Sequence, residues 1–296
     1  YRQTGEDFYS KVVRIAEALK DTPDHFENFK DALRHLRFLP AGRVQNAMGA
    51  ARQTTAYNCF VSGAIEDSMD SIMGRATDAA ETMRRGGGIG YDFSRLRPRG
   101  DRIKSLDSRA SGAVSFMQIF DAVCQTIASS GHRRGAQIGV LRVDHPDIEQ
   151  FITAKNDGTS LTGFNISVGI TDEFMRCLEK KEPFPLQFEG RVHEEVDPVA
   201  LWDMIMRSTW DWAEPGVLFI DTINKMNNLY YCENIEATNP CGEQPLPPYG
   251  ACLLGSFNLT KYVGAGAFDY GLFTGDIHHV VRAMDNVIDR TIYPLE

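Results

Sequence analysis

Short apolar runs alternate with longer amphipathic stretches along the chain from Tyr57 onward. The short runs are rich in glycine, β-branched and aromatic residues, which is typical of buried strands, whereas the longer stretches repeat apolar residues at helical spacing. The pattern predicts strands at 57–61, 88–93, 137–141, 163–168 and 216–220. It predicts helices at 67–85, 114–128, 146–155 (opened by Asp144), 172–180 and 199–213. Regular alternation of strands and helices predicts an α/β fold with a parallel sheet.

The first fifty residues have a different pattern, with helical periodicity alone. Apolar residues recur at helical spacing over 8–19, and a second helix is predicted over 24–36, ending before Pro40. We therefore expect an N-terminal helical segment, residues 1–50, followed by a main domain, residues 51–296.

The composition is that of a globular protein, because 43% of the 296 residues are hydrophobic and 24% are charged. The formal net charge of -9 argues against non-specific binding of nucleic acid. The chain has no apolar run long enough for a membrane span. Its acidic start is not a signal peptide and lacks an initiator Met, and its end is abrupt. We expect that both termini are cut from a longer chain.

The six cysteines are sparse for a chain of this length. This spacing is typical of a cytoplasmic protein with mostly reduced thiols rather than of a disulfide framework. No pair or cluster of cysteine and histidine has the spacing of a zinc site, so we expect no structural metal. Cys124 and Cys177 lie among apolar residues at helical positions and are interpreted as core residues, and Cys232 is interpreted as structural too.

A loop over 234–248, rich in proline and polar residues, interrupts the alternation. It contains Asn-Pro-Cys-Gly-Glu at 239–243, where Pro240 favours an extended conformation of the residue before it. Alternate side chains of an extended segment point the same way, so Asn239, Cys241 and Glu243 are expected to face one side. The alternative is a proline-rich surface loop with an incidental cysteine.

Further sequence motifs make the interpretation of this loop more specific. Cys252 follows in a predicted apolar strand, 251–259, and an earlier strand contains Asn58-Cys59-Phe60-Val61. Taken together with the stretches 66–72, 85–90 and 131–136, these blocks resemble the catalytic subunit of ribonucleotide reductase in the right order. The resemblance implies a ten-stranded α/β barrel, of which this chain would contain the first half, the finger loop and the start of the second half.

The resemblance also implies roles for residues of these blocks. Cys241 resembles the thiyl-radical cysteine that takes a hydrogen atom from the ribose, and Glu243 resembles the general base for the 3′-hydroxyl. Asn239 resembles the residue that hydrogen-bonds the substrate hydroxyls. Cys59 and Cys252 resemble the dithiol that reduces the 2′ position and closes to a disulfide, a two-electron reaction that suits neighbouring thiols. Further expected substrate-binding residues are Asn58, Gly87, Gly88, Pro240 and Gly242.

The glycine run at 86–90 has two interpretations. It is not a dinucleotide-binding fingerprint, because Tyr91 occupies the sixth position and the predicted helix precedes the glycines. The run suits a helix C-cap with a tight turn into a strand. By resemblance, Gly87 and Gly88 line the substrate pocket, and both interpretations are compatible.

Effector-binding residues are also implied by the resemblance. Arg133 and Arg134 lie in a loop that would link an effector to the substrate base, although a solvated turn is the alternative. Asp67 resembles a residue that hydrogen-bonds the effector, and Lys104 and Ser111 lie in the segment that would cover it. Acidic groups suit ribose hydroxyls and arginines suit phosphates.

The stretch 133–155 resembles the adenosylcobalamin-dependent class of the family. His145 is interpreted as a helix-capping residue rather than a cobalt ligand. A class I large subunit that needs a metal-oxo radical subunit is one alternative, and a non-catalytic nucleotide-binding regulatory module is another. The implied partners are a ribonucleotide substrate, a dNTP or ATP effector and a thioredoxin-like reductant. A homodimer is expected, with the rest of the barrel supplied by the same longer chain or by a second polypeptide.

Overall fold

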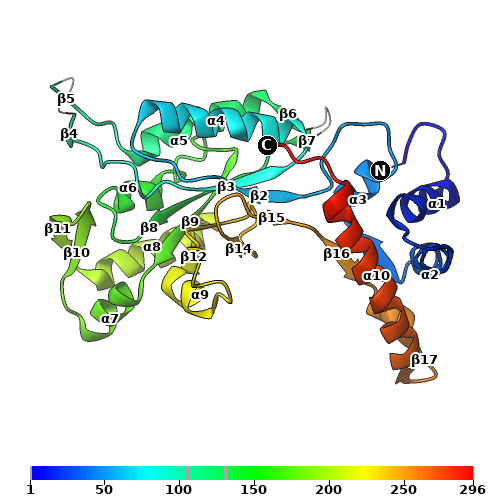
Figure 1. Ribbon diagram of the computed structural model, residues 1–296. Helices are drawn as coiled ribbons and strands as arrows, with labels where there is room; N and C mark the ends of the chain where they lie inside the picture. The colour runs from blue at the N-terminus through cyan, green and yellow to red at the C-terminus, as the bar shows by residue number, and fades with distance from the viewer. Residues whose placement is uncertain (1, 104–106, 130–132, 296) are drawn as a thin grey trace. The chain divides into compact units, whose positions relative to one another are not determined.

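The structure is a computed structural model that describes residues 2–103, 107–129 and 133–295 (Figure 1). It divides into two compact units, the first formed by residues 1–58 and 252–296 and the second by residues 59–251. The boundary between the units after residue 58 lies close to residue 50, where the sequence pattern placed the end of the N-terminal segment. The C-terminal stretch, which the sequence pattern assigned to the main domain, instead groups with the N-terminal helices.

Helices form most of the first unit. They are α1 (Phe8–Leu19), α2 (Pro23–Arg34), α3 (Gly42–Ala47) and α10 (Tyr270–Arg290), with a 3-10 turn at Leu259–Tyr262. The side chains of Asp7, Thr22 and Asp269 accept hydrogen bonds from backbone N–H groups at the starts of α1, α2 and α10 and so cap these helices. Two antiparallel pairs complete the unit: β1 (Phe38–Pro40) with β16 (Gly255–Phe257), and β17 (Val263–Gly264) with β18 (Ala267–Phe268).

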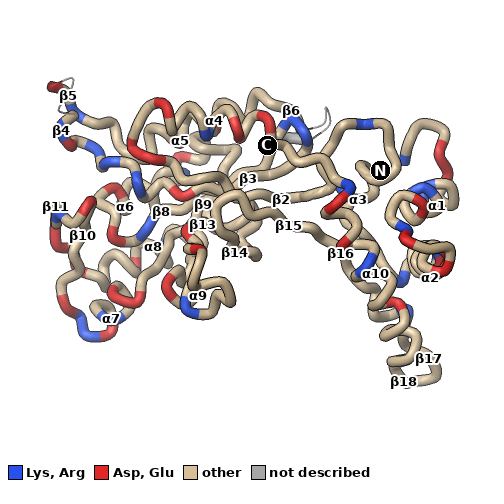
Figure 2. The backbone as a smooth tube through the Cα atoms, viewed as in Figure 1, with Lys and Arg blue, Asp and Glu red and all other residues tan. Residues whose placement is uncertain are grey.

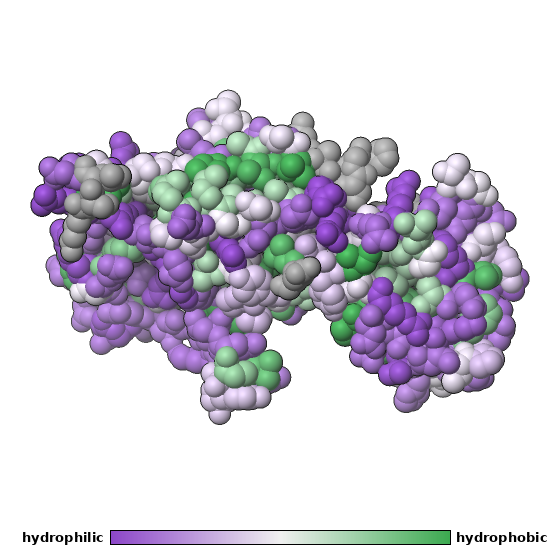
Figure 3. Space-filling model, turned by 45° about the horizontal axis from the view of Figure 1, so that its top comes forward, coloured by the Kyte–Doolittle hydropathy of each residue, from purple (hydrophilic) through white to green (hydrophobic). Residues whose placement is uncertain are grey.

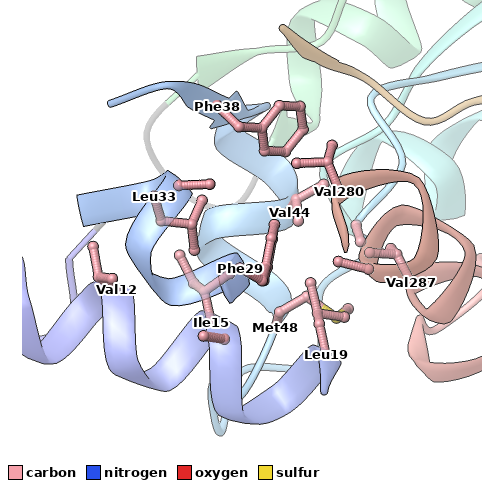
Figure 4. Packing of buried hydrophobic residues seen from close by; sticks show 14 of the residues in the cluster. Val12, Ile15, Leu19, Phe29, Leu33, Phe38, Val44, Met48, Val280 and Val287 are labelled. Carbon is pink, nitrogen blue, oxygen red and sulfur yellow. The ribbon is translucent and has the colours of Figure 1, made fainter. Parts of the chain in front are cut away.

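The helices of the first unit bury their apolar faces in one cluster (Figure 4). Ile15, Phe29, Val44 and Val287 belong to it and are fully buried. Within α1 and within α2, the residues of this cluster recur at helical spacing, so the pattern that predicted the two helices also predicted the faces that they bury.

A parallel sheet forms the centre of the second unit, as the sequence predicted. Its parallel strands, in spatial order, are β12 (Gly216–Phe219), β9 (Phe164–Ile170), β8 (Gln137–Arg142), β3 (Gly88–Asp92) and β2 (Cys59–Val61). The intervening helices are α4 (Met69–Arg84), α5 (Ala113–Thr126), α6 (Ile148–Thr153), α7 (Asp172–Lys180), α8 (Pro198–Trp212) and α9 (Ile220–Met226). Because the spatial order of these strands follows the chain, each crossover leads to the next neighbour.

Alternate residues of these strands form two different faces. Residues that are paired in register point to the same side of a parallel sheet. Ile89, Tyr91 and Phe164 lie on one side, called here the outer face, where Phe120 of α5 packs on Tyr91 with ring centroids 4.9 Å apart. Cys59, Gly88, Gly90, Ile138 and Asn165 lie on the opposite side, called here the inner face. In Figure 1, α4 and α5 lie on one side of the sheet and the β13–β14 hairpin lies on the other.

Several short hairpins complete the second unit. They are β4 (Arg102–Ile103) with β5 (Ser108–Arg109), β6 (Ala128–Ser129) with β7 (Arg133–Arg134), β10 (Phe184–Phe188) with β11 (Arg191–Val196), and β13 (Ala237–Thr238) with β14 (Pro245–Leu246). Charged residues are concentrated in the helices and in β10–β11, with few along the central strands (Figure 2). On the face shown in Figure 3, hydrophobic residues gather over α4 and α5, where Met69 and Met73 are exposed.

Three details of the sequence prediction were wrong. The helix predicted over 146–155 is the shorter α6, which begins after Asp147 rather than Asp144. The single strand predicted over 251–259 is divided into β15 (Ala251–Cys252) and β16, because β16 pairs with β1. The pair β10–β11 and helix α9 were not predicted. None of the described helices is long and apolar enough to cross a membrane.

Candidate active site

The β13–β14 hairpin lies on the inner face of the sheet. Ala237 and Leu246, one from each of its strands, pack with Val61, Val140 and Leu218 of the sheet. A Cβ atom at Gly90 would overlap the carbonyl oxygen of Thr238, so the backbones of β3 and β13 are in direct contact. Glycine is therefore required at position 90 for the hairpin to lie at this depth.

A tight turn joins the two strands and carries the candidate catalytic residues. The N–H of Gly242 donates to the carbonyl oxygen of Asn239 at 2.9 Å, and Gly242 has a φ of +83°, which favours glycine. Asn239 is fully buried, whereas Cys241 and Glu243 are exposed. The prediction of an extended segment with all three side chains on one side was therefore wrong. The turn leaves Cys241 and Glu243 exposed and buries the side chain of Asn239.

Asn239 holds the turn closed. Its backbone N–H donates to the carbonyl oxygen of Gln244 at 3.2 Å, and its Oδ1 accepts from the N–H of Gln244 at 2.9 Å. Its Nδ2 is buried and has no hydrogen-bond partner among the described residues. A buried donor without a partner costs about 1–3 kcal/mol. Such a donor is therefore a candidate contact for a bound hydroxyl group.

The thiol of Cys241 is held in its neutral form. Partial burial of the sulfur raises its pKa, and the negative charges that Glu243 and Cys59 can carry raise it further. Burial and nearby negative charge both disfavour a thiolate. The S–H group is thus preserved at neutral pH, which suits transfer of a hydrogen atom rather than nucleophilic attack.

The two predicted redox cysteines belong to different units. Cys59 opens β2 in the second unit, where the N–H of Val61 donates to the carbonyl oxygen of Gly250 at 2.8 Å. Cys252 belongs to the first unit, where its carbonyl oxygen accepts from the N–H of Asn58 at 3.2 Å. Both cysteines are buried. The disulfide between them stays a prediction.

The predicted substrate-binding glycines are packed against protein atoms. A Cβ atom at Gly87 would lie 2.6 Å from the ring of Phe60, and one at Gly88 would lie 2.8 Å from Cγ of Pro240. The N–H of Gly87 donates to the carbonyl oxygen of Thr82 at 2.9 Å, which closes the end of α4. The C-cap interpretation is therefore confirmed, and contact of these glycines with a substrate stays a prediction.

The predicted effector residues are only partly described. Asp67 binds Arg97 through Oδ2 and Nε at 2.6 Å, and Ser111 accepts a hydrogen bond from Ser115 at 2.6 Å. The backbone of Arg133 and Arg134 forms β7, and Lys104 lies outside the described residues. These observations do not test whether the four residues and Lys104 bind an effector, which stays a prediction.

A cavity of about 530 Å³ lies beside Asp67 and Arg97. Phe188, Arg191 and His193 of the β10–β11 hairpin line it as well. Sequence reasoning missed these residues. The usable signal was the pair of short runs at 184–188 and 191–196 on either side of a Glu-Gly turn, which is a hairpin pattern.

A second cavity, of about 650 Å³, opens at the carboxyl ends of the parallel strands. It is lined by Asp92, Arg142 and Glu236, and burial raises the pKa of Asp92 to about 7. Arg95 also lines it and binds Glu236 at 2.8 Å and Glu66 at 2.6 Å. Sequence reasoning missed this cavity, although polar residues that follow parallel strands were a usable signal.

His145 is buried just before α6, but the capping role predicted for it is not borne out, because the N-cap residue is Asp147 and no side chain among the described residues caps this helix. Its Nδ1 accepts from the N–H of Asp147 at 3.0 Å at the start of α6, and its Nε2 binds the carbonyl oxygen of Leu96 at 2.8 Å. Burial lowers its pKa. The described residues contain no group of three or more His, Cys, Asp or Glu side chains that is arranged to hold a metal ion.

Comparisons with known proteins agree with this geometry. The family model for the ribonucleotide reductase barrel domain matches residues 57–296. The vitamin B12-dependent ribonucleoside-diphosphate reductase of Mycobacterium tuberculosis is 42% identical over 90% of this chain and 39% of its own length. The enzyme of that name from Thermoplasma acidophilum is 39% identical over 98% of this chain and 38% of its own length.

A further relative is the vitamin B12-dependent ribonucleotide reductase of Streptomyces clavuligerus, which is 32% identical over 100% of this chain and 33% of its own length. The chain thus spans less than two fifths of the length of these relatives. The match to the family model covers most of the chain and includes the hairpin and the parallel sheet. The chain therefore belongs to the ribonucleotide reductase family.

Proposed function

We propose that this chain supplies the radical cysteine and the surrounding half-barrel of a vitamin B12-dependent ribonucleotide reductase. The observation that carries the proposal is the hairpin, which holds Cys241 and Glu243 together on an exposed turn over the inner face. The names of the relatives that are 39–42% identical favour the cobalamin class and a ribonucleoside diphosphate as substrate.

The proposed reaction begins at Cys241. A thiyl radical on its sulfur takes the 3′ hydrogen atom of the ribose, while the carboxylate of Glu243 takes the proton of the 3′-hydroxyl. The 2′-hydroxyl leaves as water after it receives a proton from the thiol pair of Cys59 and Cys252. The pair supplies two electrons as it closes to a disulfide, and the thiol of Cys241 returns its hydrogen atom to the 3′ carbon.

The candidate catalytic residues have separate roles in this proposed reaction. The raised pKa of Cys241 keeps a hydrogen atom on its sulfur between turnovers. Glu243 is exposed and can therefore reach a hydroxyl of a bound ribose. The Nδ2 of Asn239, which has no hydrogen-bond partner among the described residues, would donate to a second hydroxyl. Asn58, Gly87, Gly88, Pro240 and Gly242 remain the further candidates for contact with the substrate.

Adenosylcobalamin is the cofactor that we propose. When bound, it supplies the carbon radical that takes the hydrogen atom of a thiol. The residues present fit this chemistry, because Cys241 is exposed on the turn and its sulfur carries a hydrogen atom. Cys241 and Gly242 would meet the cofactor.

The proposal includes the partners that reduction requires. A thioredoxin-like reductant would reopen the disulfide, and a dNTP or ATP effector would bind near Asp67, Lys104, Ser111, Arg133 and Arg134. The exposed Met69 and Met73 on α4, where hydrophobic residues gather in Figure 3, support a homodimer through this face. Completion of the barrel requires further strands, and the cytoplasm is the proposed compartment because the thiols must be reduced.

The deciding experiment replaces one sulfur by oxygen. Cys241→Ser in the full-length protein should abolish ribonucleotide reduction in the presence of adenosylcobalamin and dithiothreitol, because an O–H bond is too strong for the radical step. Cys177→Ser, at a buried cysteine of α7, is the matched control and should keep the activity. Turnover by Cys241→Ser at the wild-type rate would exclude the proposed role, and wild-type activity without adenosylcobalamin would exclude the proposed class.

A further inference from the structure

One side chain of the sheet reaches the peptide that carries the candidate radical cysteine. Asn165 lies near the start of β9, and its Nδ2 donates to the carbonyl oxygen of Pro240 at 2.7 Å. That carbonyl belongs to the peptide group between Pro240 and Cys241. Because a peptide group is planar, a hydrogen bond to its oxygen restricts the position of the next Cα atom, here that of Cys241.

The register of the sheet explains why Asn165 can make this contact. Gly90 pairs with Ile138, and Ile138 pairs with Asn165, so Gly90 and Asn165 lie in one row across β3, β8 and β9 on the inner face. The hairpin contacts both ends of this row. Thr238 lies directly on Gly90, and Pro240 reaches Asn165.

The hydrogen bond from Asn165 restrains the turn at a point that the two glycines do not contact. Gly88 and Gly90 allow the hairpin to approach the sheet, and Pro240 lies against Gly88. Both glycines belong to β3, so their contacts restrain the hairpin at that strand alone. The amide of Asn165 restrains the turn from a different strand, β9.

We propose that Asn165 is a positioning residue for Cys241. It acts on the reaction through the Pro240 carbonyl and fixes where the sulfur lies relative to the ribose. Effective positioning of reacting atoms accounts for a large part of enzymatic rate, and displacement by about 1 Å can cost about 100-fold. This inference rests on the proposed function only for its kinetic readout, because the position of the turn can be measured without turnover.

Asn165→Ala removes the donor, and Asn165→Asp replaces the amide by an isosteric carboxyl. An ionised carboxylate repels the Pro240 carbonyl, whereas a protonated carboxyl donates to it. We expect kcat to fall about tenfold or more in both variants at neutral pH, with KM within about twofold of wild type. The ratio of Asn165→Asp activity to wild-type activity should rise as the pH is lowered.

The second readout is the rate at which iodoacetamide alkylates Cys241, followed by mass spectrometry of the peptide that contains it. A looser turn should change that rate several-fold in both Asn165 variants. Asn28→Asp is the matched control, because Asn28 of α2 also donates from its amide to a backbone carbonyl, that of Asp24 at 2.9 Å, in an exposed hydrogen bond. It should change neither readout.

Three results would overturn the inference: an unchanged alkylation rate in both Asn165 variants, a loss confined to KM, or an equal loss in Asn28→Asp. Failure of the proposed function gives a different result. In that case Cys241→Ser would keep its activity, while the Asn165 variants would still alter alkylation of Cys241. If Asn165→Ala fails to fold, Asn165→Asp and its pH dependence decide the question.

Discussion

The two faces of the parallel sheet are built from the same strands and are covered by different elements, helices on the outer face and the β13–β14 hairpin on the inner face (Figure 1). On the outer face, Ile89, Tyr91 and Phe164 are almost completely buried, and Phe120 packs on Tyr91 in an edge-to-face arrangement. On the inner face, Gly90 and Asn165 contact the hairpin, and apolar residues of both the sheet and the hairpin pack together. Successive residues of a strand point to opposite sides, so one strand can pack on the helices with one residue and contact the hairpin with the next.

This difference between the faces indicates that the outer face mainly stabilises the fold and that the inner face positions the candidate catalytic residues. Buried aromatic pairs contribute about 0.5–1.5 kcal/mol beyond the burial of their area. Glycines inside strands reduce stability. The outer face therefore contributes the packing of large aromatic side chains, whereas Gly88 and Gly90 on the inner face leave room for the hairpin that carries Cys241. Substitutions on the two faces should consequently affect different measurements.

The largest expected effect is on the outer face. Phe120→Ala should lower the free energy of unfolding by about 3–5 kcal/mol, because it leaves a cavity among Tyr91, Phe93 and Phe164. Chemical denaturation measures this loss, and kcat per folded molecule should stay near wild type. Phe219→Ala, at an exposed phenylalanine, should have a much smaller effect on stability. Equal losses in the two variants would contradict the assignment of the core.

The second effect distinguishes two glycines in the same sheet. Gly90→Ala should lower kcat by about 100-fold, because the new methyl group would displace Thr238 and the hairpin from the inner face. Gly139→Ala is the matched variant on the outer face, where the methyl group would meet the flexible end of Met117. It should cost about 1–3 kcal/mol of stability and leave kcat unchanged. A wild-type kcat for Gly90→Ala would show that contact of the hairpin with Gly90 is not needed for activity.

The third prediction concerns pH. Burial raises the pKa of Asp92 to about 7, well above the value of about 4 for an unfolded chain. The folded state therefore binds this proton more tightly, and stability is lost as the pH rises from about 4 to about 7. Asp92→Asn removes the charge. It should stabilise the protein by on the order of 2 kcal/mol at about pH 8 and have little effect at about pH 4.

Denaturation curves of Asp92→Asn and wild type at the two pH values test this sign. The hydrogen bonds from Ser94 to Oδ1 of Asp92 can form with asparagine as well, so the comparison isolates the charge. A gain of equal size at both pH values would show that ionisation of Asp92 is not its cause.

The smallest expected effect is that of a single hydroxyl on the outer face. Tyr91→Phe removes the hydrogen bond from the Tyr91 hydroxyl to Oε1 of Gln137, which is 3.0 Å long and buried. The loss should be about 1 kcal/mol of unfolding free energy, with kcat unchanged. Tyr230→Phe, at an exposed tyrosine, should change neither quantity. A fall in kcat for Tyr91→Phe would show that the two faces are not separable.

The sequence by itself determined the elements of the sheet and the identity of the loop residues. Helix 172–180 was predicted with the bounds that α7 has, and each parallel strand was predicted to within a few residues. These features are encoded by local periodicity, which depends only on neighbouring residues. The motif at 239–243 was also visible, because its residue types and order are a property of the chain alone.

Tertiary structure decided how those residues are used. The segment at 239–243 is a closed turn and not an extended strand, since Asn239 bonds to Gln244 across the hairpin. The contact between Asn165 and Pro240 joins residues 75 positions apart and follows from the register of three strands. The depth of the hairpin depends on Gly90, whose absent side chain meets Thr238. Such contacts are set by which faces meet in space, and spacing along one chain does not contain that information.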